Sequence, residues 1–414
     1  MEKLLVLGSS FGSMEIVTRA KERGIYTIVT DYLPVDESNA KPLADEVWGF
    51  STNDLDHLEE KCRQTGISGI ISGVSQFNIE MSMHLCDRLG LPKYCTWDAW
   101  SYTRNKRAFK DVCKACGVHV AEDYYLRDYP THDYTSMQFP VVVKPVDSGG
   151  NDGISYCYKS DDIEPALKYA RSASESDDII IERFLSGEEY LGFYALADGE
   201  ASLIDVWTLH YQRGEKTNIY SITTTETPVI DRYISECNEK IKQVFKTAGY
   251  TEGVAWVELI LDQGKEFYVL ETGYRLAGSM LQYTFKEVCG FDVVDWMIDT
   301  AFGITHTKKD LPREQEGSYD KCGCSYILWA NNDGVIKSIQ GLDEIENQNA
   351  FVDFLRRPGF KMTKHKPLGE IIFTRDSVGE MIDMIKTIND RVQILNTDGE
   401  NSFIKFTSFD KLIS

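Results

Sequence analysis

The stretch WVELIL at residues 256–261, together with FYVLETGYR at residues 267–275, decides the interpretation of this chain. Both runs have the composition of strands, and the DQGKE between them carries the glycine and the charges of a hairpin turn. We therefore predict paired strands that direct Glu258 and Glu271 into one space, with Arg275 just beyond. Two inward carboxylates need a cation, and Mg²⁺ fits best because it takes oxygen ligands and is completed by waters and nucleotide phosphates. The sequence leaves one alternative open, in which these side chains lie on the wet face of a hairpin.

Length and charge bound the class of protein. A chain of 414 residues with 42 % hydrophobic residues predicts two or three domains with well-filled cores. Acidic residues outnumber basic ones by 65 to 44, the net charge is -21, and no basic tract appears. Because nucleic-acid binding depends on cations that face phosphates, nucleic acid is not an expected partner.

Targeting signals and cysteine usage indicate the compartment. Met1 leads directly into the strand-like KLLVLG, and no apolar run approaches the roughly 20 residues that span a bilayer. The 10 cysteines are scattered, which predicts reduced thiols, and the close pairs Cys113/Cys116 and Cys322/Cys324 are interpreted as packing residues. We expect a cytoplasmic protein that does not contact a membrane.

Residues 1–100 alternate strand and helix patterns, which predicts a Rossmann-like parallel sheet with ligands at the carboxyl ends of its strands. GSSFGS after the first strand lacks the full dinucleotide spacing. Asp31, after the second strand, would suit a ribose in a dehydrogenase, which is a less favoured alternative.

Residues 101–310 read as a second domain. A helix is expected over 102–116, and residues 117–186 read as a small lid with strands VVVKP, ISYCY and IIIERFL and one helix. Strands at 191–197, 201–209 and 217–225, a helix at 230–248, the acidic hairpin and a helix at 291–302 follow. Residues 311–414 are expected to form a C-terminal unit that completes the body.

The segment VVVKPVDSGGNDGI at 141–154 sets Lys144 at the end of a buried strand and places Ser148, Gly149, Gly150 and Gly153 in the loop beyond. Glycines let main-chain amides approach an anion, and a lysine supplies a point charge for phosphate. The segment therefore suits a nucleotide lid. A tight hairpin with a surface lysine is the alternative.

The segment IIIERFLSGEEYLG at 179–192 places Glu182, Leu185 and Glu189 along and beyond an apolar strand. An extended main chain can present a donor and an acceptor to adenine, while a carboxylate accepts from ribose hydroxyls. Spacing alone also fits an ordinary acidic strand end.

In their order, these segments resemble the ATP-grasp superfamily of carboxylate-amine ligases over roughly residues 1–310. The resemblance implies an ATP-grasp fold of α/β and α+β character and a site for ATP with Mg²⁺, or Mn²⁺ in its place. It implies the following roles: nucleotide lysines at Lys106 and Lys144; a phosphate lid at Ser148, Gly149, Gly150 and Gly153; an adenine hinge at Glu182 and Leu185; a ribose carboxylate at Glu189; metal ligands at Glu258 and Glu271; and a catalytic cation at Arg275, with Lys144.

One position departs from the family pattern. The family usually has an asparagine between the metal glutamate and the arginine, whereas this chain has Gly273, which offers no side-chain oxygen. A weak second metal site or a nucleotide-binding protein with reduced catalysis therefore stays open.

The acceptor side is less defined. RLAGSM at 275–280 resembles the amino-acid ligase and carbamoyl-phosphate-synthase-like branches, in which the loop after the arginine receives a carboxylate, here at Gly278 and Ser279. Trp207, His210 and Tyr211 are substrate candidates in the segment VWTLHYQRGEK, which we expect to be a polar and aromatic loop.

The favoured function is ATP-dependent ligation of a small carboxylate to a small amine through an acyl phosphate. Alternatives are a carboxylase that uses carboxyphosphate, a nucleotide sensor and a dehydrogenase. The substrates are not determined by the sequence, and a homodimer is one assembly that it allows.

Overall fold

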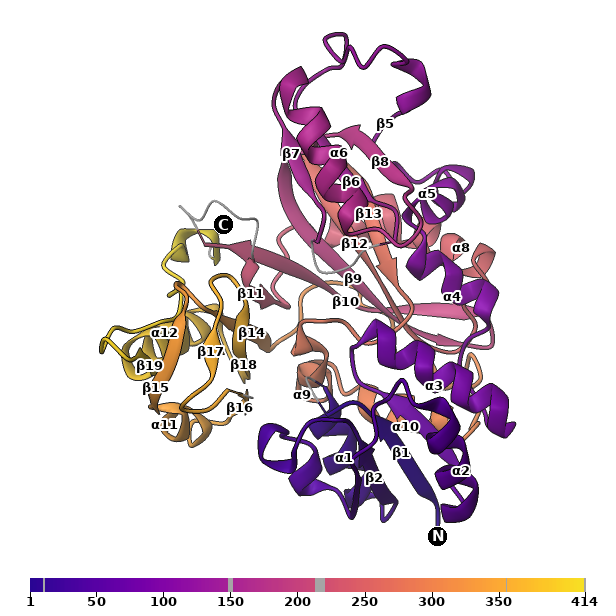
Figure 1. Ribbon diagram of the computed structural model, residues 1–414, viewed down its shortest axis with the longest axis vertical. Coiled ribbons are helices and arrows are strands. Elements are labelled where there is room, and N and C mark those ends of the chain that lie inside the picture. Colours follow the sequence, from indigo (N-terminus) through magenta and orange to yellow (C-terminus); the bar gives the residue numbers. More distant parts are fainter. Residues whose placement is uncertain (10–11, 148–151, 213–219, 355, 413–414) are drawn as a thin grey trace.

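A computed structural model describes residues 1–9, 12–147, 152–212, 220–354 and 356–412. Figure 1 shows the N-terminal sheet at the bottom, a small lid at the top and the C-terminal strands at the left, around a long central sheet. The α/β and α+β class expected from the sequence is confirmed by this arrangement.

The N-terminal domain is the predicted parallel sheet, in the order β3-β2-β1-β4. Its pairing is parallel throughout, with Leu5 opposite Ile28 on one side and Ile70 on the other. Successive residues of β1 face different cores, which explains its continuous apolar run. The elements are β1 (Lys3–Leu7), α1 (Ser13–Glu22), β2 (Tyr26–Thr30), β3 (Glu46–Trp48), α2 (Leu55–Thr65), β4 (Gly69–Ser72) and α3 (Gln76–Leu89).

The helix expected over residues 102–116 is two helices, α4 (Trp97–Arg104) and α5 (Lys106–Ala115). Asn105 separates them, because it adopts an extended backbone and its side chain accepts a hydrogen bond of 3.0 Å from the Ala108 amide. This cap ends one helix, starts the next and places Lys106 in the first turn of α5.

The lid is an antiparallel sheet in the order β5-β8-β6-β7 with α6 packed on it (Figure 1). Val141 and Val143 of β6, Ile181 of β8, and Ile163 and Leu167 of α6 form its own small core. The elements are β5 (Asp123–Tyr124), β6 (Val141–Pro145), β7 (Ser155–Cys157), α6 (Ile163–Ser172) and β8 (Ile179–Arg183).

The central sheet has the order β13-β12-β9-β10-β11-β14-β18-β16. The three expected strands from 191 to 225 and the acidic hairpin all belong to it. Its members are β9 (Gly187–Ala197), β10 (Glu200–Tyr211), β11 (Tyr220–Thr224), β12 (Gly253–Asp262), β13 (Glu266–Gly273), β14 (Cys322–Trp329), β16 (Ala350–Asp353) and β18 (Pro367–Arg375). Strands from the C-terminal quarter thus extend a sheet begun before residue 200, and the domain limits at 100 and 310 stay a prediction.

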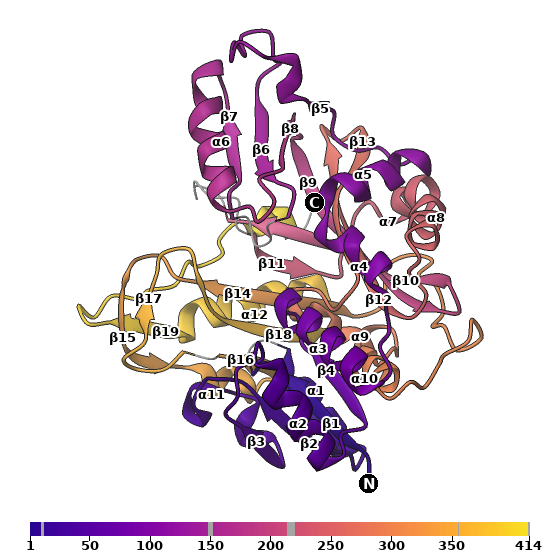
Figure 2. The same cartoon turned by 45° about the vertical axis from the view of Figure 1, so that its right-hand side comes forward.

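Helices cover the central sheet, and a smaller sheet lies beside it (Figure 2). The helix expected over 230–248 is α7 (Ile230–Tyr233), a π-helical turn (Ile234–Asn238) and α8 (Glu239–Thr247); the one expected over 291–302 is α10 (Val293–Ala301). The others are α9 (Phe285–Val288), α11 (Leu342–Glu346), α12 (Val378–Arg391) and short 3₁₀ turns at Val35–Glu37, Lys41–Leu43, Leu126–Asp128, Ser160–Asp162, Met280–Thr284 and Phe409–Leu412. The small sheet comprises β15 (Gly334–Gln340), β17 (Lys361–Met362) and β19 (Gln393–Asn396).

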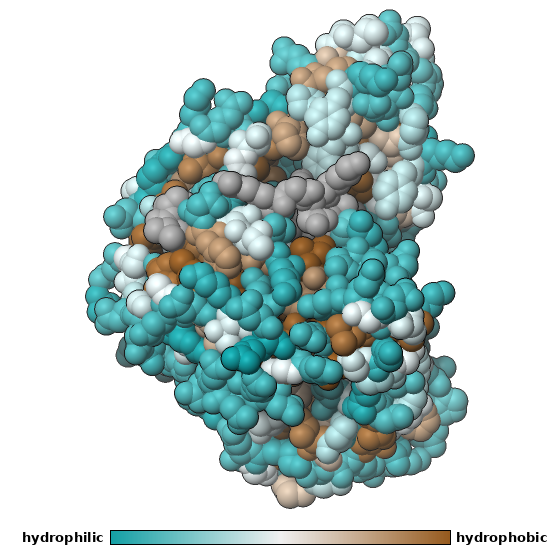
Figure 3. All heavy atoms as spheres, turned by 90° about the vertical axis from the view of Figure 1, so that its left-hand side faces the viewer, coloured by the Kyte–Doolittle hydropathy of each residue, from teal (hydrophilic) through white to brown (hydrophobic). Residues whose placement is uncertain are grey.

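The cysteines are free thiols, and both Cys113 and Cys322 are buried packing residues. Within the described residues, no helix is long and apolar enough to cross a membrane. Figure 3 shows a face that is mostly hydrophilic, with hydrophobic residues scattered between hydrophilic ones.

Candidate functional site

The predicted hairpin is confirmed, and its two carboxylates face each other. Glu258 of β12 lies directly opposite Glu271 of β13, and the register shifts immediately after Glu258, as in a β-bulge. Burial, then Glu271 and Glu189, raise the pKa of Glu258 well above its ordinary value, although Lys144 and Lys106 oppose this. Like charges directly opposite each other destabilise a strand pair. This place in the sheet is therefore built to receive positive charge.

The two nucleotide lysines of the sequence analysis converge on this acidic pair. Lys106 Nζ lies 3.5 Å from Glu271 Oε2. Lys144, on β6 of the lid, contacts Glu182, and its charge acts on both Glu258 and Glu271. Burial lowers the pKa of Lys144, but Glu182, Glu271 and Glu258 outweigh burial and raise it overall. Lys144 is therefore charged at neutral pH.

Glu182 has a different neighbourhood from the one expected. Its carboxylate binds Lys144 and also Lys110 Nζ, at 2.9 Å, and Lys110 in turn contacts Asp123. The two lysines outweigh burial and lower the pKa of Glu182. The Glu182 side chain thus holds Lys144. The predicted adenine contact would then come from the main chain up to Leu185, and it stays a prediction. Sequence reasoning missed Lys110, although it follows Lys106 by one helical turn.

Glu189 lies on β9, beside the acidic pair. Its carboxylate accepts a hydrogen bond from the Tyr211 hydroxyl at the end of β10. Burial raises the pKa of Glu189; the Tyr211 hydrogen bond lowers it and Glu271 raises it further. Tyr211 thus belongs to the acidic site, and the ribose role of Glu189 stays a prediction.

Arg275 follows the hairpin and packs on it. Its guanidinium carbon lies 5.0 Å from the centre of the Trp256 ring, and Nη1 donates a 2.7 Å hydrogen bond to the Leu276 carbonyl. Burial lowers the pKa of Arg275, and the nearby Glu271 acts in the opposite direction. The arginine is thus held beside the acidic pair by stacking.

Trp256 also explains the missing asparagine. Gly273 lies opposite Trp256 in the strand register, and a Cβ on Gly273 would lie 2.3 Å from the indole ring. No side chain fits there while Trp256 keeps this position. The departure from the family pattern is therefore a packing consequence of the tryptophan across the hairpin.

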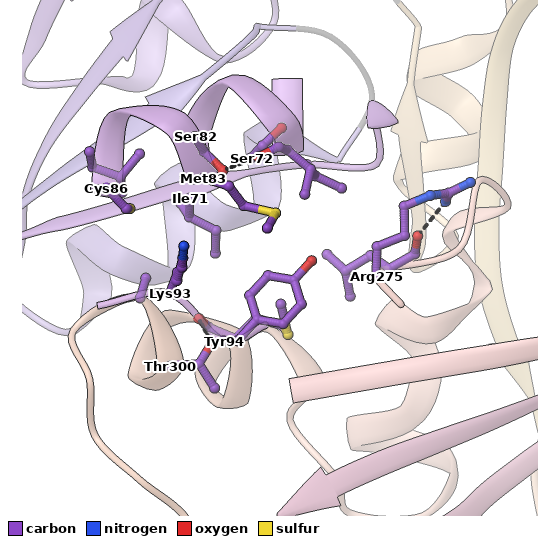
Figure 4. A pocket seen from close by; sticks show the side chains of 15 residues that line it. Ile71, Ser72, Ser82, Met83, Cys86, Lys93, Tyr94, Arg275 and Thr300 are labelled. Atoms are coloured by element: carbon purple, nitrogen blue, oxygen red, sulfur yellow. Dashed lines mark hydrogen bonds between the residues drawn. The ribbon is translucent and has the colours of Figure 1, made fainter. Parts of the chain in front are cut away.

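The cavity behind Arg275 is too small for a substrate. Figure 4 shows it between the end of β4, α3, Tyr94 and Arg275, whose guanidinium points away from it. Its volume is about 20 Å³, enough for about one water molecule. Substrates must therefore bind elsewhere.

The loop expected to receive a carboxylate contains an acid of its own. Glu370 of β18 accepts hydrogen bonds from the Met280 amide at 2.8 Å, the Ser279 hydroxyl at 3.4 Å and the Ser325 hydroxyl. Burial raises the pKa of Glu370 to about 7. This neighbourhood does not favour an anion at Ser279, whereas a side chain at Gly278 would meet open space.

Two of the expected substrate contacts lie in the core. The loop predicted over VWTLHYQRGEK is wrong for residues 206–211, because they belong to β10, where both faces are buried; residues 213–216 lie outside the described residues. Trp207 is 0 % exposed and stacks on Phe193 at 5.4 Å, so its predicted substrate contact is also wrong. His210 is buried, its Nε2 lies 3.0 Å from the Thr224 hydroxyl, and burial lowers its pKa to about 3.

Of the predicted phosphate loop, Ser148, Gly149 and Gly150 lie outside the described residues. Gly153 has a φ of +76°, and a Cβ there would lie 2.7 Å from Pro145. The position therefore requires glycine on packing grounds, and its phosphate contact stays a prediction.

The acidic pair offers carboxylate oxygens of the kind that Mg²⁺ binds. No group of three His, Cys, Asp or Glu side chains that could hold a metal occurs among the described residues. Mg²⁺ is usually bound through one or two carboxylates, with waters and substrate phosphates completing its coordination. The opposed pair Glu258 and Glu271 fits this second type of site.

Comparisons with known proteins agree with this geometry. Residues 105–309 match the family described as "Carbamoyl-phosphate synthase L chain, ATP binding domain". A formate-dependent phosphoribosylglycinamide formyltransferase of Bacteroides thetaiotaomicron is 28 % identical over 190 residues, which are 45 % of this chain and 48 % of that protein. The matches span about half the length of the first curated relatives.

Solved structures share the whole fold. The L-amino acid ligase from Bacillus licheniformis has a TM-score of 0.79 at 17 % identity, covering 96 % of this chain and 99 % of that one. The biotin carboxylase domain of Hydrogenobacter thermophilus 2-oxoglutarate carboxylase, solved with MgADP and bicarbonate, has a TM-score of 0.76 at 18 % identity, covering 100 % and 93 %. Residues 105–309 therefore match an ATP-grasp domain, and the whole chain has the fold of the ATP-grasp superfamily. ATP and Mg²⁺ are the cofactors of that superfamily, and the resemblance seen in the sequence is confirmed.

Proposed function

We propose that this protein is an ATP-dependent ligase that joins a small carboxylate to a small amine through an acyl phosphate and releases ADP and phosphate. The observation that carries the proposal is the opposed pair Glu258 and Glu271 with Lys106 and Lys144 beside it. Such a cluster suits nucleotide phosphates that arrive with a metal ion.

The reaction has two steps. First, a carboxylate oxygen attacks the γ-phosphorus of ATP, an acyl–phosphate bond forms, and the bond to the bridging oxygen breaks to leave ADP. Second, the amine attacks the acyl carbon, loses a proton and forms the amide, while the bond from carbon to the phosphate oxygen breaks. Both steps gather negative charge on phosphate oxygens, so positioned cations would accelerate them.

Three side chains supply these cations. Lys144, held by Glu182, and Lys106, at the start of α5, would hold the phosphates. Arg275, stacked on Trp256, would face the phosphate that is transferred. Mg²⁺ bound by Glu258 and Glu271 would neutralise the remaining phosphate charge. The lid that carries Lys144 would shield the acyl phosphate from water.

Phosphate release from Mg·ATP, measured across paired carboxylates and amines, tests the proposal. We expect release that needs both a carboxylate and an amine and that is lost in Glu271→Gln. Glu266→Gln is the matched control, because Glu266 lies on the same strand but is exposed at the turn. Release that depends on bicarbonate alone would instead favour a carboxylase, a reaction class for which a relative of this fold provides the precedent.

Gly273 keeps a second candidate in view. Because Trp256 leaves no room for a side-chain oxygen there, a second metal would lack a ligand, which favours a nucleotide-binding protein with weak catalysis. Tight ATP binding without ADP formation across the whole panel would support this candidate.

We also propose that the protein works in the cytoplasm on small molecules and forms a homodimer. The dimer described for the Hydrogenobacter domain supports the assembly. Light scattering on the purified chain, with fractionation of cells that produce it, tests both points.

A further inference from the structure

A second pair of opposed carboxylates lies at the other edge of the central sheet. Asp353 of β16 is directly opposite Glu370 of β18, and Glu15 of α1 faces them from the N-terminal domain. Residues of α1, β16 and β18 line one groove. Burial, then the charge of Asp353, raises the pKa of Glu15 to about 8, and burial raises that of Asp353 to about 6. Glu15 therefore lies within electrostatic reach of two acids from the other end of the chain.

Several acceptor atoms here have no donor. Both carboxylate oxygens of Glu15, Oδ2 of Asp353 and Oε1 of Gln282 are buried without a hydrogen-bond partner. Gln282 is 0 % exposed, and its amide nitrogen already donates to the Ala277 carbonyl at 3.2 Å. A buried acceptor left without a donor costs about 1–3 kcal/mol. The cluster thus combines a carboxyl group and an amide whose buried oxygens lack hydrogen-bond donors.

Positive charge near the cluster is limited. Among the described residues, Glu15, Asp353 and Glu370 form no ion pair. Arg356 is the one cation whose charge favours the ionised form of Asp353, and burial lowers the pKa of Arg356 itself. Asn39 donates a 2.8 Å hydrogen bond to Asp353, and neutral donors serve Glu370. The three acids are therefore not neutralised by neighbouring side chains.

One side of the cluster lies at a surface groove. Glu15 and Gln282 line a groove of about 1020 Å³ between α1, the turn at 280–284 and strands β16 and β18. Pockets that hold small molecules have volumes of roughly 300–1,000 Å³. The groove is therefore large enough for a metabolite.

The missing partner is an organic cation in preference to a metal ion. No three acidic or other metal-binding side chains lie close enough to hold a metal in the described part of the chain. A group with several N–H donors, by contrast, can serve acceptors that come from separate elements. Primary ammonium and guanidinium groups have this property.

The cluster is also linked to the proposed reaction centre. Glu370 binds the amide of Met280 and the hydroxyl of Ser279, in the same loop that begins at Arg275. An amine held here would lie along the loop that leaves the site of phosphate transfer.

We propose that Glu15 and Gln282, with the charges of Asp353 and Glu370 behind them, bind a protonated ammonium or guanidinium group of the amine substrate of the ligase, at a nitrogen other than the one that attacks the acyl carbon. That the bound cation is a substrate rests on the proposed function. Binding of the cation depends on the cluster alone. Neutral amines and aromatic amines would bind poorly.

Calorimetry without nucleotide tests cation binding on the full chain. The probes are 1,3-diaminopropane, L-lysine and agmatine, with 1,3-propanediol as the neutral control and CaCl₂ as the metal control. We expect at least one protonated amine to bind about tenfold more tightly than the diol and the metal salt, the usual size of a charged hydrogen bond. Equal binding of the diol or of Ca²⁺, or no binding of any amine, would overturn the inference.

Isosteric variants locate the site. Glu15→Gln and Asp353→Asn should each weaken amine binding about tenfold, while their circular dichroism stays that of the wild type. Glu22→Gln is the control, because Glu22 lines the same groove but is exposed and paired with Arg19. An unchanged affinity in both variants would refute the assignment.

The two proposals fail in different ways. Amine binding as expected, without phosphate release on any carboxylate, would remove the ligase function and keep the cation site. Ligation with an unchanged KM for the amine in both variants would keep the ligase and remove the cation site.

Discussion

Two edges of one sheet carry the same unusual feature and resolve it differently. At one edge Glu258 faces Glu271, and at the other Asp353 faces Glu370. Lysines from the lid and from α5 approach the first pair, whereas amide and hydroxyl groups serve the second. Opposed carboxylates must be neutralised, and the neighbours decide what neutralises them. Fixed lysines suit phosphates with a metal ion, and neutral donors leave room for a proton or a bound cation.

Removing one charge at the lysine-rich edge should have the largest effect. Glu271→Gln keeps the shape of the side chain but removes a metal ligand, so we expect phosphate release to fall about 100-fold, as when a preorganised electrostatic group is lost. Thermal unfolding should change little, because the variant also relieves repulsion with Glu258. Loss of the fold without a specific loss of activity would make Glu271 a structural residue.

Disrupting the packing of Trp256 against Gly273 should have the second largest effect. Gly273→Ala forces a Cβ into the indole ring, and we expect the free energy of unfolding to fall by about 2 kcal/mol, the usual cost of overpacking. Urea unfolding measures this change. Gly278→Ala is the control, because a Cβ on Gly278 meets open space, and it should lower the free energy of unfolding by less. Gly264→Ala would not serve, because the positive φ of Gly264 would itself add strain. Equal losses in both variants would contradict the packing argument.

Removing Lys144 or Lys106 tests whether the lysine-rich edge binds the nucleotide. Lys144→Ala and Lys106→Ala should each weaken ATP binding about tenfold, because each removes a charged donor to phosphate. The fold should survive, since Glu182 keeps Lys110 as its partner in the first variant. Calorimetry with Mg·ATP provides the measurement. Unchanged affinity in both variants would remove the nucleotide role from this edge.

Protonation of Glu370, at the second edge, should make the stability of the fold depend on pH. Because burial raises the pKa of Glu370 from 4.5 to about 7, the folded protein keeps a proton that the unfolded chain has lost between these values. Its contribution is present below pH 4.5 and is lost as the pH rises through 7. Glu370→Gln should flatten the fall in stability over this range by on the order of 1 kcal/mol. Parallel pH profiles for the wild type and the variant would contradict the raised pKa.

Sequence patterns by themselves determined the elements that depend on neighbours along the chain. The alternation in residues 1–100 gave the parallel sheet, and the turn between two strand-like runs gave the hairpin with Glu258 opposite Glu271. The order of motifs gave the ATP-grasp class. These features follow from periodicity and turn chemistry, which act over a few residues.

Tertiary structure alone decided the rest. Trp207 is in the core because Phe193 of the neighbouring strand and Phe285 of α9 pack against its ring. Glu182 binds Lys110 because the lid returns to α5. Asp353 and Glu370 meet Glu15 from the opposite end of the chain. Burial and charge depend on which distant segments pack together, and no local pattern in the sequence records that choice.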